Sequence, residues 1–408
     1  MLDLRYVREH TEELKLNIKR RGLTVDIDRW VKLDARRNEL IPQVDELRAA
    51  LKLSGKPSPE ELADLQQAKA ELAKKQEELQ YIEQEWKTLW GDIPNLIAPN
   101  TPEGGEEMNR EERQGGTKPT GLAVYKDHLE LNEKLQFVDF ESGAKVAGSR
   151  FYFLKGPGVK LWRACVSLIS DLIAEAGFEL MMVPHMVNTR VAEGTGFLPR
   201  GEERQIYKIE GDDLNLIATA ELPLTGMYMD DIIDVAQPIL LAGISPCYRL
   251  EGGTYGKFSK GLFRVHQFEK LEMYAYTKPE DSNVMLQRIL ELEEKICNAL
   301  EIPYRVIRIA DGDLSAPAYE KYDIEYWNPT DNSWRELTSC SNCTDYQARR
   351  LNIRYRNEAG ELVHVHTLNG TAITSSRTLV ALLENHQTAE GEVRIPEALQ
   401  QYYGGDKL

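Results

Sequence analysis

The sequence predicts an α+β fold in which an antiparallel α-helical hairpin precedes a mixed, largely antiparallel sheet with flanking helices. Two observations lead to this prediction. The first hundred residues repeat apolar side chains at alternating spacings of three and four. From about residue 120, short β-rich runs alternate with helical stretches without forming regular βαβ units.

The hairpin is predicted by two apolar seams within residues 30–51 and 65–93. A 3.5-residue period sustained over this length is typical of a coiled coil. Residues 54–60 between the seams read Ser-Gly-Lys-Pro-Ser-Pro-Glu, which ends one helix and begins the next. We therefore expect a hairpin over about residues 27–93, with residues 1–25 forming a short helix at its base.

The rest of the chain is predicted to form the sheet and its covering helices. Residues 94–118, which are rich in Pro, Gly, Asn and Glu, are expected to be a linker. The predicted helices cover 161–176, 281–300 and 374–385, and the predicted strands cover 180–184, 215–219, 264–268 and 323–327. We expect two domains, over residues 1–110 and 111–408.

Composition narrows the class of protein. The 408 residues are 42% hydrophobic and 28% charged, which is typical of a globular chain with a sizeable core. They contain no apolar run of about 18 residues, so no membrane span is expected, and the first residues do not resemble a signal peptide. The five cysteines indicate a reducing, cytoplasmic environment. Cys340 and Cys343 form one C-x-x-C, which is either half of a metal or redox site or two semi-buried thiols.

The charge distribution leaves two interpretations open. A net charge of −16 argues against nucleic-acid binding, because phosphate contacts need clustered Lys and Arg. Basic residues are nevertheless concentrated at the base and first helix of the hairpin, where Arg29, Lys32 and Arg36 recur at helical spacing. This face is either an ordinary solvated surface of the coiled coil or an RNA contact.

Four polar stretches occur where a structural strand or helix would be apolar. Arg249 and Glu251 are two apart on a predicted strand and are followed by glycines. The next strand carries Arg264 and Phe268, with Glu272 beyond them. Arginine suits phosphate because its planar fork forms bidentate bonds, although a salt-bridged surface hairpin has the same pattern.

The other three stretches offer oxygen ligands and one more arginine. Glu336 and Ser339 are oxygen donors of the kind that Mg²⁺ prefers. Small residues before Arg377 permit close approach of a ligand to a helix start. Thr219 and Glu221 offer a hydroxyl and a carboxylate to an ammonium group. Each pattern by itself is common in proteins without such a site.

The order of these stretches is more specific than any one of them. R-x-E with its glycines, R-V-H-Q-F-E-K, R-E-x-x-S-C-S-N-C, Q-A-R-R and H-T-L-N-G follow one another, and the chain begins Met-Leu-Asp-Leu-Arg. This series resembles the seryl-tRNA synthetase family over essentially the whole chain. The resemblance implies a class II synthetase catalytic domain, a homodimer, and a hairpin that binds tRNA(Ser) across the dimer through Arg29, Lys32 and Arg36.

The resemblance also implies roles for individual residues. Arg249, Glu336 and Arg377 are expected to be catalytic, and Glu336 and Ser339 to hold Mg²⁺. The residues expected to bind ATP are Arg249, Leu250, Glu251, Arg264, Val265, Phe268, Glu336, Leu337, Thr338, Ser339 and Arg377. The residues expected to bind L-serine are Thr219, Ala220, Glu221, Arg249, Glu272, Asn369 and Thr371.

The expected activity is that of a serine--tRNA ligase, which forms seryl-adenylate from serine and ATP and transfers serine to tRNA(Ser). One alternative is a related enzyme that loads an amino acid onto a carrier other than tRNA, although such relatives typically lack the helical arm. A second is an inactive RNA-binding protein on the same fold, which is expected to have lost Arg249, Glu336 or Arg377. The chain departs from the family pattern at 258–260, where it reads Phe-Ser-Lys.

Overall fold

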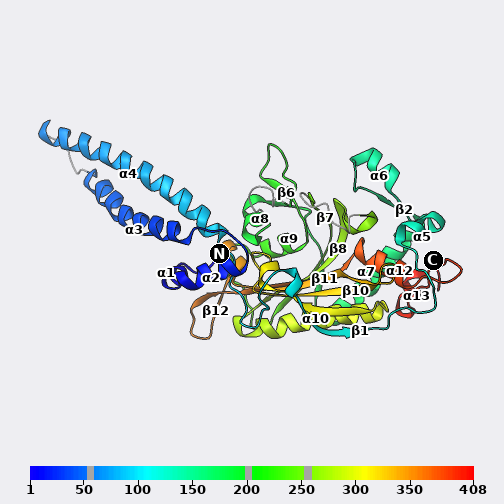
Figure 1. The fold of residues 1–408 in the computed structure, drawn as a ribbon. Helices are drawn as coiled ribbons and strands as arrows, with labels where there is room; N and C mark the ends of the chain where they lie inside the picture. The colour runs from blue at the N-terminus through cyan, green and yellow to red at the C-terminus, as the bar shows by residue number, and fades with distance from the viewer. Residues whose placement is uncertain (53–58, 198–204, 252–259) are drawn as a thin grey trace. The chain divides into compact units, whose positions relative to one another are not determined.

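A computed structural model describes residues 1–52, 59–197, 205–251 and 260–408 (Figure 1). The chain forms two compact units, Met1–Leu96 and Ile97–Leu408. The sequence analysis placed a domain boundary after residue 110. Residues 97–110 instead contact the second unit, where the Gly104 backbone N–H donates to the Asp311 carboxylate at 2.9 Å.

The described residues of the first unit form four helices, and two of them form the expected hairpin. Figure 1 shows α3 (Ile27–Ala50) and α4 (Pro59–Asp92) side by side. Their seam buries Trp30, Leu40 and Val44, and the ring of Trp30 stacks on that of Trp86 at 5.9 Å. Because the apolar positions recur every 3.5 residues, each helix presents one continuous apolar stripe to the other.

The single short helix expected within residues 1–25 is in fact two helices. They are α1 (Leu4–Glu9) and α2 (Thr11–Arg20). His10 leaves the helical conformation with φ −126° and ψ 37°, and its backbone N–H donates to the Tyr6 carbonyl, which ends α1. Apolar periodicity continues through a one-residue break of this kind, so the sequence pattern did not reveal it.

The second unit is built on an eight-stranded sheet. All neighbouring strands are antiparallel except β4 and β7, which are parallel. This confirms the mixed, largely antiparallel sheet that the sequence predicts. In order across the sheet, the strands are β1 (Arg110–Gly115), β9 (Tyr304–Arg308), β10 (Glu320–Asn328), β11 (Ser333–Thr344), β14 (His366–Thr374), β8 (Gln267–Thr277), β7 (Ile239–Tyr248) and β4 (Glu179–Met182).

Two sequence predictions need correction. The expected linker over 94–118 contains a 3₁₀ turn (Glu106–Met108) and the edge strand β1, which pairs with β9. Five of the six β1 residues are exposed, so the strand lacks the apolar alternation by which strands are recognised. The strand expected over 264–268 begins only at Gln267, because Gly261–Phe263 forms a 3₁₀ turn before it.

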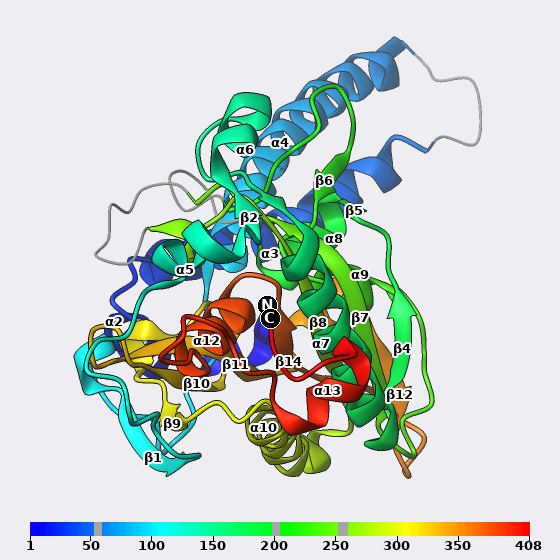
Figure 2. The same ribbon diagram turned by 90° about the vertical axis from the view of Figure 1, so that its right-hand side faces the viewer.

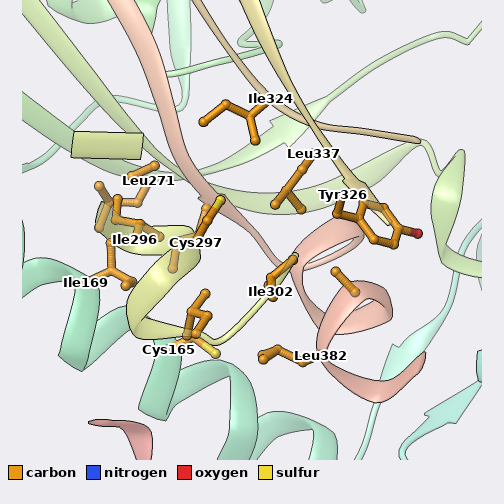
Figure 3. Packing of buried hydrophobic residues seen from close by; sticks show 14 of the residues in the cluster. Cys165, Ile169, Leu271, Ile296, Cys297, Ile302, Ile324, Tyr326, Leu337 and Leu382 are labelled. Carbon is orange, nitrogen blue, oxygen red and sulfur yellow. The ribbon is translucent and has the colours of Figure 1, made fainter. Parts of the chain in front are cut away.

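Three predicted helices are confirmed with small changes of boundary. They are α7 (Gly156–Glu175), α10 (Ser282–Ala299) and α12 (Arg377–Asn385). Their apolar faces form the main core against one face of the sheet, where Cys165 and Ile169 of α7 lie near Cys297 of α10 and Leu382 of α12 (Figure 3). Figure 2 shows α7 and α12 with the C-terminal helix α13 (Glu397–Tyr403) beside the strands.

Three short helices pack against the other face of the sheet. They are α8 (Thr189–Thr195), α9 (Glu221–Gly226) and α11 (Tyr346–Leu351), and they contact one another in pairs. The buried rings of Tyr274 and Tyr276 on β8 belong to this second core. Among the described residues, the remaining α-helices and strands are α5 (His128–Leu135), β2 (Val138–Asp139), α6 (Phe140–Ala147), β3 (Phe153–Leu154), β5 (Met186–Asn188), β6 (Leu214–Leu216), β12 (Arg354–Arg356) and β13 (Leu362–His364).

None of the helices in the described ranges is both long enough and apolar enough to cross a membrane.

Candidate active site

A cavity of about 480 Å³ lies on the sheet face that carries the second core. Side chains of β8, β11 and β14 form its floor, and segments after β6 and β7 contribute to its walls. Most of the residues that the sequence nominated line this one cavity. They are Thr219, Glu221, Arg249, Glu251, Val265, Phe268, Glu272, Glu336, Leu337, Thr338, Ser339, Asn369, Thr371 and Arg377.

Strand alternation explains how these residues reach the cavity. On β8, Lys270 and Glu272 line the cavity, whereas Leu271 and Met273 between and after them are fully buried in the main core. Successive side chains of a strand point to opposite faces, so β8 lines the cavity with one set of side chains and packs into the main core with the other. The three strands that form the floor are neighbours in the sheet, although they are far apart in the sequence.

Three nominated residues of this unit do not line the cavity. Ala220 is fully buried in the second core, and the Leu250 backbone N–H donates to the Gln205 carbonyl at 2.8 Å. Arg264 forms an ion pair with Glu251 at 2.8 Å, which holds the Glu251 carboxylate at the cavity wall. Glu251 has φ 46°, a conformation that non-glycine residues rarely adopt.

One end of the cavity is rich in arginine and aromatic surface. The guanidinium of Arg249 lies 5.2 Å from the ring centre of Phe268, and both line the wall. Arg377 at the start of α12 forms an ion pair with Glu336 of β11 at 2.5 Å. Flat cationic groups beside an exposed ring face can bind an anionic group and a planar heterocycle together.

Glu336 is ionised because its neighbours are cationic. Burial by itself raises the pKa of this carboxyl, but Arg377 and Lys321 outweigh burial and lower the pKa to about 2. Lys321, which lies on the neighbouring strand β10, also contacts Asp323 of the same strand at 3.0 Å. Burial raises the pKa of Asp323 to about 7 despite this lysine. The result at neutral pH is a carboxylate at Glu336 that faces the cavity.

A second group of lining residues, the carboxylate-rich end of the cavity, is more deeply buried. Glu221 is 5% exposed, and burial together with the charge of Glu272 raises its pKa to about 7. Lys270 forms an ion pair with Glu272, and its ammonium lies 3.4 Å from the Thr219 hydroxyl. The carboxylates of Glu221 and Glu272 and the hydroxyls of Thr219 and Thr371 line this end of the cavity. Together they can accept hydrogen bonds from an ammonium group and from one further polar group of a small ligand.

The sequence analysis missed Lys270 and Lys321, which both line the cavity. Lys270 could have been found, because it lies at even spacing between the nominated residues Phe268 and Glu272 on one strand. No comparable signal marks Lys321, since its neighbours on β10 were not nominated.

The nominated residues of the hairpin lie in the first unit. Arg29 forms an ion pair with Glu85 of α4 at 2.8 Å, and Arg36 pairs with Glu78 at 2.7 Å. Both pairs join α3 to α4, which is the behaviour expected of a solvated coiled-coil face. Lys32 is exposed on α3.

All five cysteines are buried, and Cys343 lines the cavity. Burial raises the pKa of the Cys340 thiol well above its ordinary value. Over the described part of the chain, no group of three or more His, Cys, Asp or Glu side chains is arranged to hold a metal ion. The C-x-x-C therefore has the arrangement of two structural thiols.

Comparison with known proteins identifies this arrangement. Residues 1–97 match the seryl-tRNA synthetase N-terminal domain, and residues 206–386 match the class II core domain of the G, H, P, S and T tRNA synthetases. The serine--tRNA ligase of Rubrobacter xylanophilus is 46% identical over 419 residues, which cover 100% of this chain and 99% of the relative. The chain belongs to the seryl-tRNA synthetase family. The expected family and its class II fold are thereby confirmed.

Two solved structures of this family resemble the chain over its whole length. Seryl-tRNA synthetase from Pyrococcus horikoshii, crystallised with ATP, is 37% identical with a TM-score of 0.89, covering 100% of this chain and 99% of that one. The cytoplasmic serine-tRNA ligase of Naegleria fowleri, in complex with AMP, is 32% identical with a TM-score of 0.84, covering 100% and 98%. These relatives hold adenine nucleotides.

Proposed function

We propose that this synthetase is a serine--tRNA ligase that activates L-serine with ATP in the cavity and then transfers serine to tRNA(Ser). The observation that carries the proposal is that two groups of interacting charged side chains line one cavity. The arginine-rich end with Arg249 and Arg377 suits a nucleotide, and the carboxylate-rich end with Glu221 and Glu272 suits an amino acid's ammonium group. The reacting carboxylate and α-phosphate would then meet between them.

At the nucleotide end, Arg249 binds the α-phosphate in this proposal, and Arg264 beyond it binds the γ-phosphate. The ring of Phe268 and the guanidinium of Arg377 hold the adenine between them, while Glu251 and the backbone of Val265 contact its edge. Arg377 must then release Glu336, with which it is paired at 2.5 Å. Nucleotide binding exchanges this ion pair for contacts to the ligand. Leu250, Leu337 and Thr338 complete the nucleotide end.

Mg²⁺ fits the donor set beside the phosphates. Glu336 and Ser339 supply a carboxylate that is ionised at neutral pH and a hydroxyl, both lining the cavity. Mg²⁺ is usually held by one or two carboxylates together with substrate phosphates, so two protein ligands suffice. When bound, the ion neutralises phosphate charge and polarises the phosphate oxygens.

At the amino-acid end, Glu221 and Glu272 receive the serine ammonium group, and Thr371 and Asn369 contact its hydroxyl. Thr219 and the backbone of Ala220 line the same end. Polar groups left unpaired by alanine would penalise that analogue strongly, because they are buried. Rejection of alanine therefore needs no separate editing site in this proposal.

The chemistry follows from alignment and charge neutralisation. A serine carboxylate oxygen attacks the α-phosphorus of ATP, and the bond to the bridging oxygen breaks to release pyrophosphate. A ribose hydroxyl of the tRNA 3′-terminal adenosine then attacks the seryl carbonyl carbon, and AMP leaves. Arg249, Glu336 and Arg377 hold the groups in line and balance their charge, which supplies most of the rate.

The first unit, residues 1–96, is proposed to bind tRNA(Ser) through the hairpin face of Arg29, Lys32 and Arg36, and the second unit, residues 97–408, to catalyse. Lys32 and Arg29 are exposed on α3, and Arg29 and Arg36 also pair with carboxylates of α4. A homodimer, in which each hairpin binds tRNA across the dimer, is part of the proposal. A cytoplasmic location is part of the proposal, because five cysteines are few and odd in number for a chain of 408 residues.

The test is serine-dependent ATP–pyrophosphate exchange, run beside alanine, threonine and glycine, followed by charging of tRNA(Ser). Exchange with serine and stable seryl-tRNA support the proposal. Exchange without charging favours a relative that loads another carrier. No exchange with any amino acid leaves an RNA-binding protein on the synthetase fold.

A further inference from the structure

Gln347, the second residue of α11, lies behind the amino-acid end of the cavity and does not line it. Its side chain is fully buried and makes four hydrogen bonds. The amide nitrogen donates to the Glu221 carboxylate at 2.8 Å and to the Thr195 carbonyl at 3.2 Å. The amide oxygen accepts from the hydroxyls of Thr367 at 2.7 Å and Tyr274 at 3.3 Å.

These four contacts fix which way the amide points. A backbone carbonyl accepts only, so the nitrogen must face Thr195, and the oxygen is left to face the Thr367 and Tyr274 hydroxyls. The second N–H is then directed at the Glu221 carboxylate. The four bonds use every donor and acceptor of the amide, which makes any other rotamer costly in a site without water access.

The ionised form of Glu221 depends on the Gln347 N–H donor, because the other neighbours of Glu221 have opposing effects on its pKa. Glu272 of β8 repels the charged form, whereas Lys270 of β8 and Asn369 of β14 favour it. Burial and Glu272 together raise the pKa of Glu221 to about 7, and the Gln347 hydrogen bond is the first cause that opposes them. The carboxylate and its protonated form are therefore close in free energy at neutral pH.

We propose that Gln347 is a positioning residue for serine recognition, which directs the Glu221 carboxylate into the cavity and keeps it ionised so that it can pair with the substrate ammonium. The inference rests on the proposed function, because it takes the carboxylate-rich end as the serine site. The hydrogen bonds of Gln347 connect α11 to four other helices and strands. Gln347 joins α11 to α8 through Thr195, to α9 through Glu221, to β8 through Tyr274 and to β14 through Thr367.

The primary test is Gln347→Met, which keeps the length of the side chain and removes both N–H donors. We expect the KM for serine in pyrophosphate exchange to rise by about ten- to hundredfold, the effect of one lost charge-assisted hydrogen bond. The KM for ATP should stay within about twofold, since Glu221 does not face the nucleotide. Asn328→Leu is the matched control, because it removes another buried amide that donates to a glutamate carboxylate, Glu384 at 2.8 Å, outside the cavity, and it should leave both KM values unchanged.

A pH series separates positioning from general loss of packing. Without the donor, the pKa of Glu221 rises further, so more of it is protonated at pH 6 than at pH 8. The ratio of serine KM between Gln347→Met and wild type should therefore fall as the pH is raised. Gln347→Glu, which keeps the shape and adds a like charge, should raise serine KM at least as much as Gln347→Met.

Several outcomes would overturn the inference. Equal changes in the KM for serine and for ATP, a pH-independent ratio, or a Gln347→Glu variant with wild-type serine KM would show that Gln347 only fills the core. Should Gln347→Met fail to fold, the serine KM of Gln347→Glu alone decides the question. Absence of serine-dependent exchange in the wild-type protein would instead refute the proposed function.

Discussion

The hairpin and the cavity use the same kinds of charged side chain with opposite access to water. In the hairpin, the Arg29 and Glu85 side chains remain 46% and 31% exposed. In the cavity, Lys270 and Glu272 are 8% and 2% exposed. Water and salt screen the charges of Arg29 and Glu85. Lys270 and Glu272 have lost their hydration on burial, so each of these charges is stabilised mainly by the other.

The difference shows that the contribution of an ion pair to stability depends on how far water and salt can reach it. Exposed pairs between α3 and α4 guide the register of two helices whose association depends on the apolar seam. Buried charge at the cavity is expensive and does not stabilise the fold, so a ligand that needs these charges is the better explanation for them.

The largest effect that would test this comparison is expected from Lys270→Met. Removing the lysine leaves the Glu272 carboxylate buried without its cation, which should lower the free energy of unfolding by about 3–5 kcal/mol. Urea unfolding followed by circular dichroism measures this. Arg29→Met in the hairpin is the matched control and should shift the thermal midpoint by less than about 2 °C. Similar effects of the two substitutions would break the comparison.

Arg377→Ala should come next in size. The variant loses the guanidinium that balances charge at the nucleotide end, and kcat/KM for ATP in serine-dependent exchange should fall by about 10²- to 10³-fold. Arg394→Ala removes a comparable ion pair, with Glu301 at 2.6 Å, away from the cavity. Activity of that control should stay within about twofold. An active Arg377→Ala enzyme would contradict the assignment of the nucleotide end.

A pH-dependent stability difference should follow from Glu221. Its pKa is raised in the folded state to about 7, so the unfolded chain ionises first as pH rises from about 4.5. Relative to Glu221→Gln, the wild-type protein should therefore lose about 3 kcal/mol of stability between pH 4.5 and 7, and no more above pH 7. Urea unfolding of both proteins at pH 5 and pH 8 measures the difference, and a constant difference would refute a buried, titrating Glu221.

The hairpin should respond to pH with the opposite sign and in a lower range of pH. A hydrogen bond from Arg29 lowers the pKa of Glu85 below its ordinary value of 4.5, although burial opposes the change. Its contribution to stability is therefore fully present above about pH 4.5 and is lost as pH falls through the lowered value. Urea unfolding of Glu85→Gln and of the wild-type protein should thus differ by a constant amount between pH 5 and pH 8, where the difference for Glu221→Gln changes, and should converge only at more acidic pH.

The smallest effect is expected from Lys32→Gln on the hairpin. Loss of one exposed phosphate-binding cation should raise the KM for tRNA(Ser) severalfold and reduce the salt dependence of its binding by about one unit of log–log slope. Pyrophosphate exchange, which needs no tRNA, should not change. Lys74→Gln on α4 is the matched control, since Lys74 is also exposed. An equal change in both variants would contradict an RNA-binding face on α3.

Sequence reasoning succeeded where the signal is local. The 3.5-residue seam predicts the α3–α4 hairpin, because a helix places residues three and four apart on one face whatever the rest of the chain does. It was wrong about β1, whose exposed charged residues form a strand by pairing with the backbone of β9. A strand of this kind depends on a partner from another part of the chain.

In the candidate site too, sequence motifs predicted some residues, whereas others were found only through the pairing of strands. Family motifs named Arg249, Glu336 and Arg377, and the structure brings all three to one cavity. Lys321 was missed, because its relation to Glu336 exists only across the pairing of β10 with β11.

By itself, the sequence determined the helical hairpin, the mixed antiparallel sheet and the family, since these depend on period, order and residue type along the chain. Only the tertiary structure decided which charges lose water and which side chains meet. Gln347 and Glu221 are 126 residues apart in the sequence, and no local pattern relates them. Their contact arises because folding buries both, and a buried polar group must find its partner wherever the fold brings one.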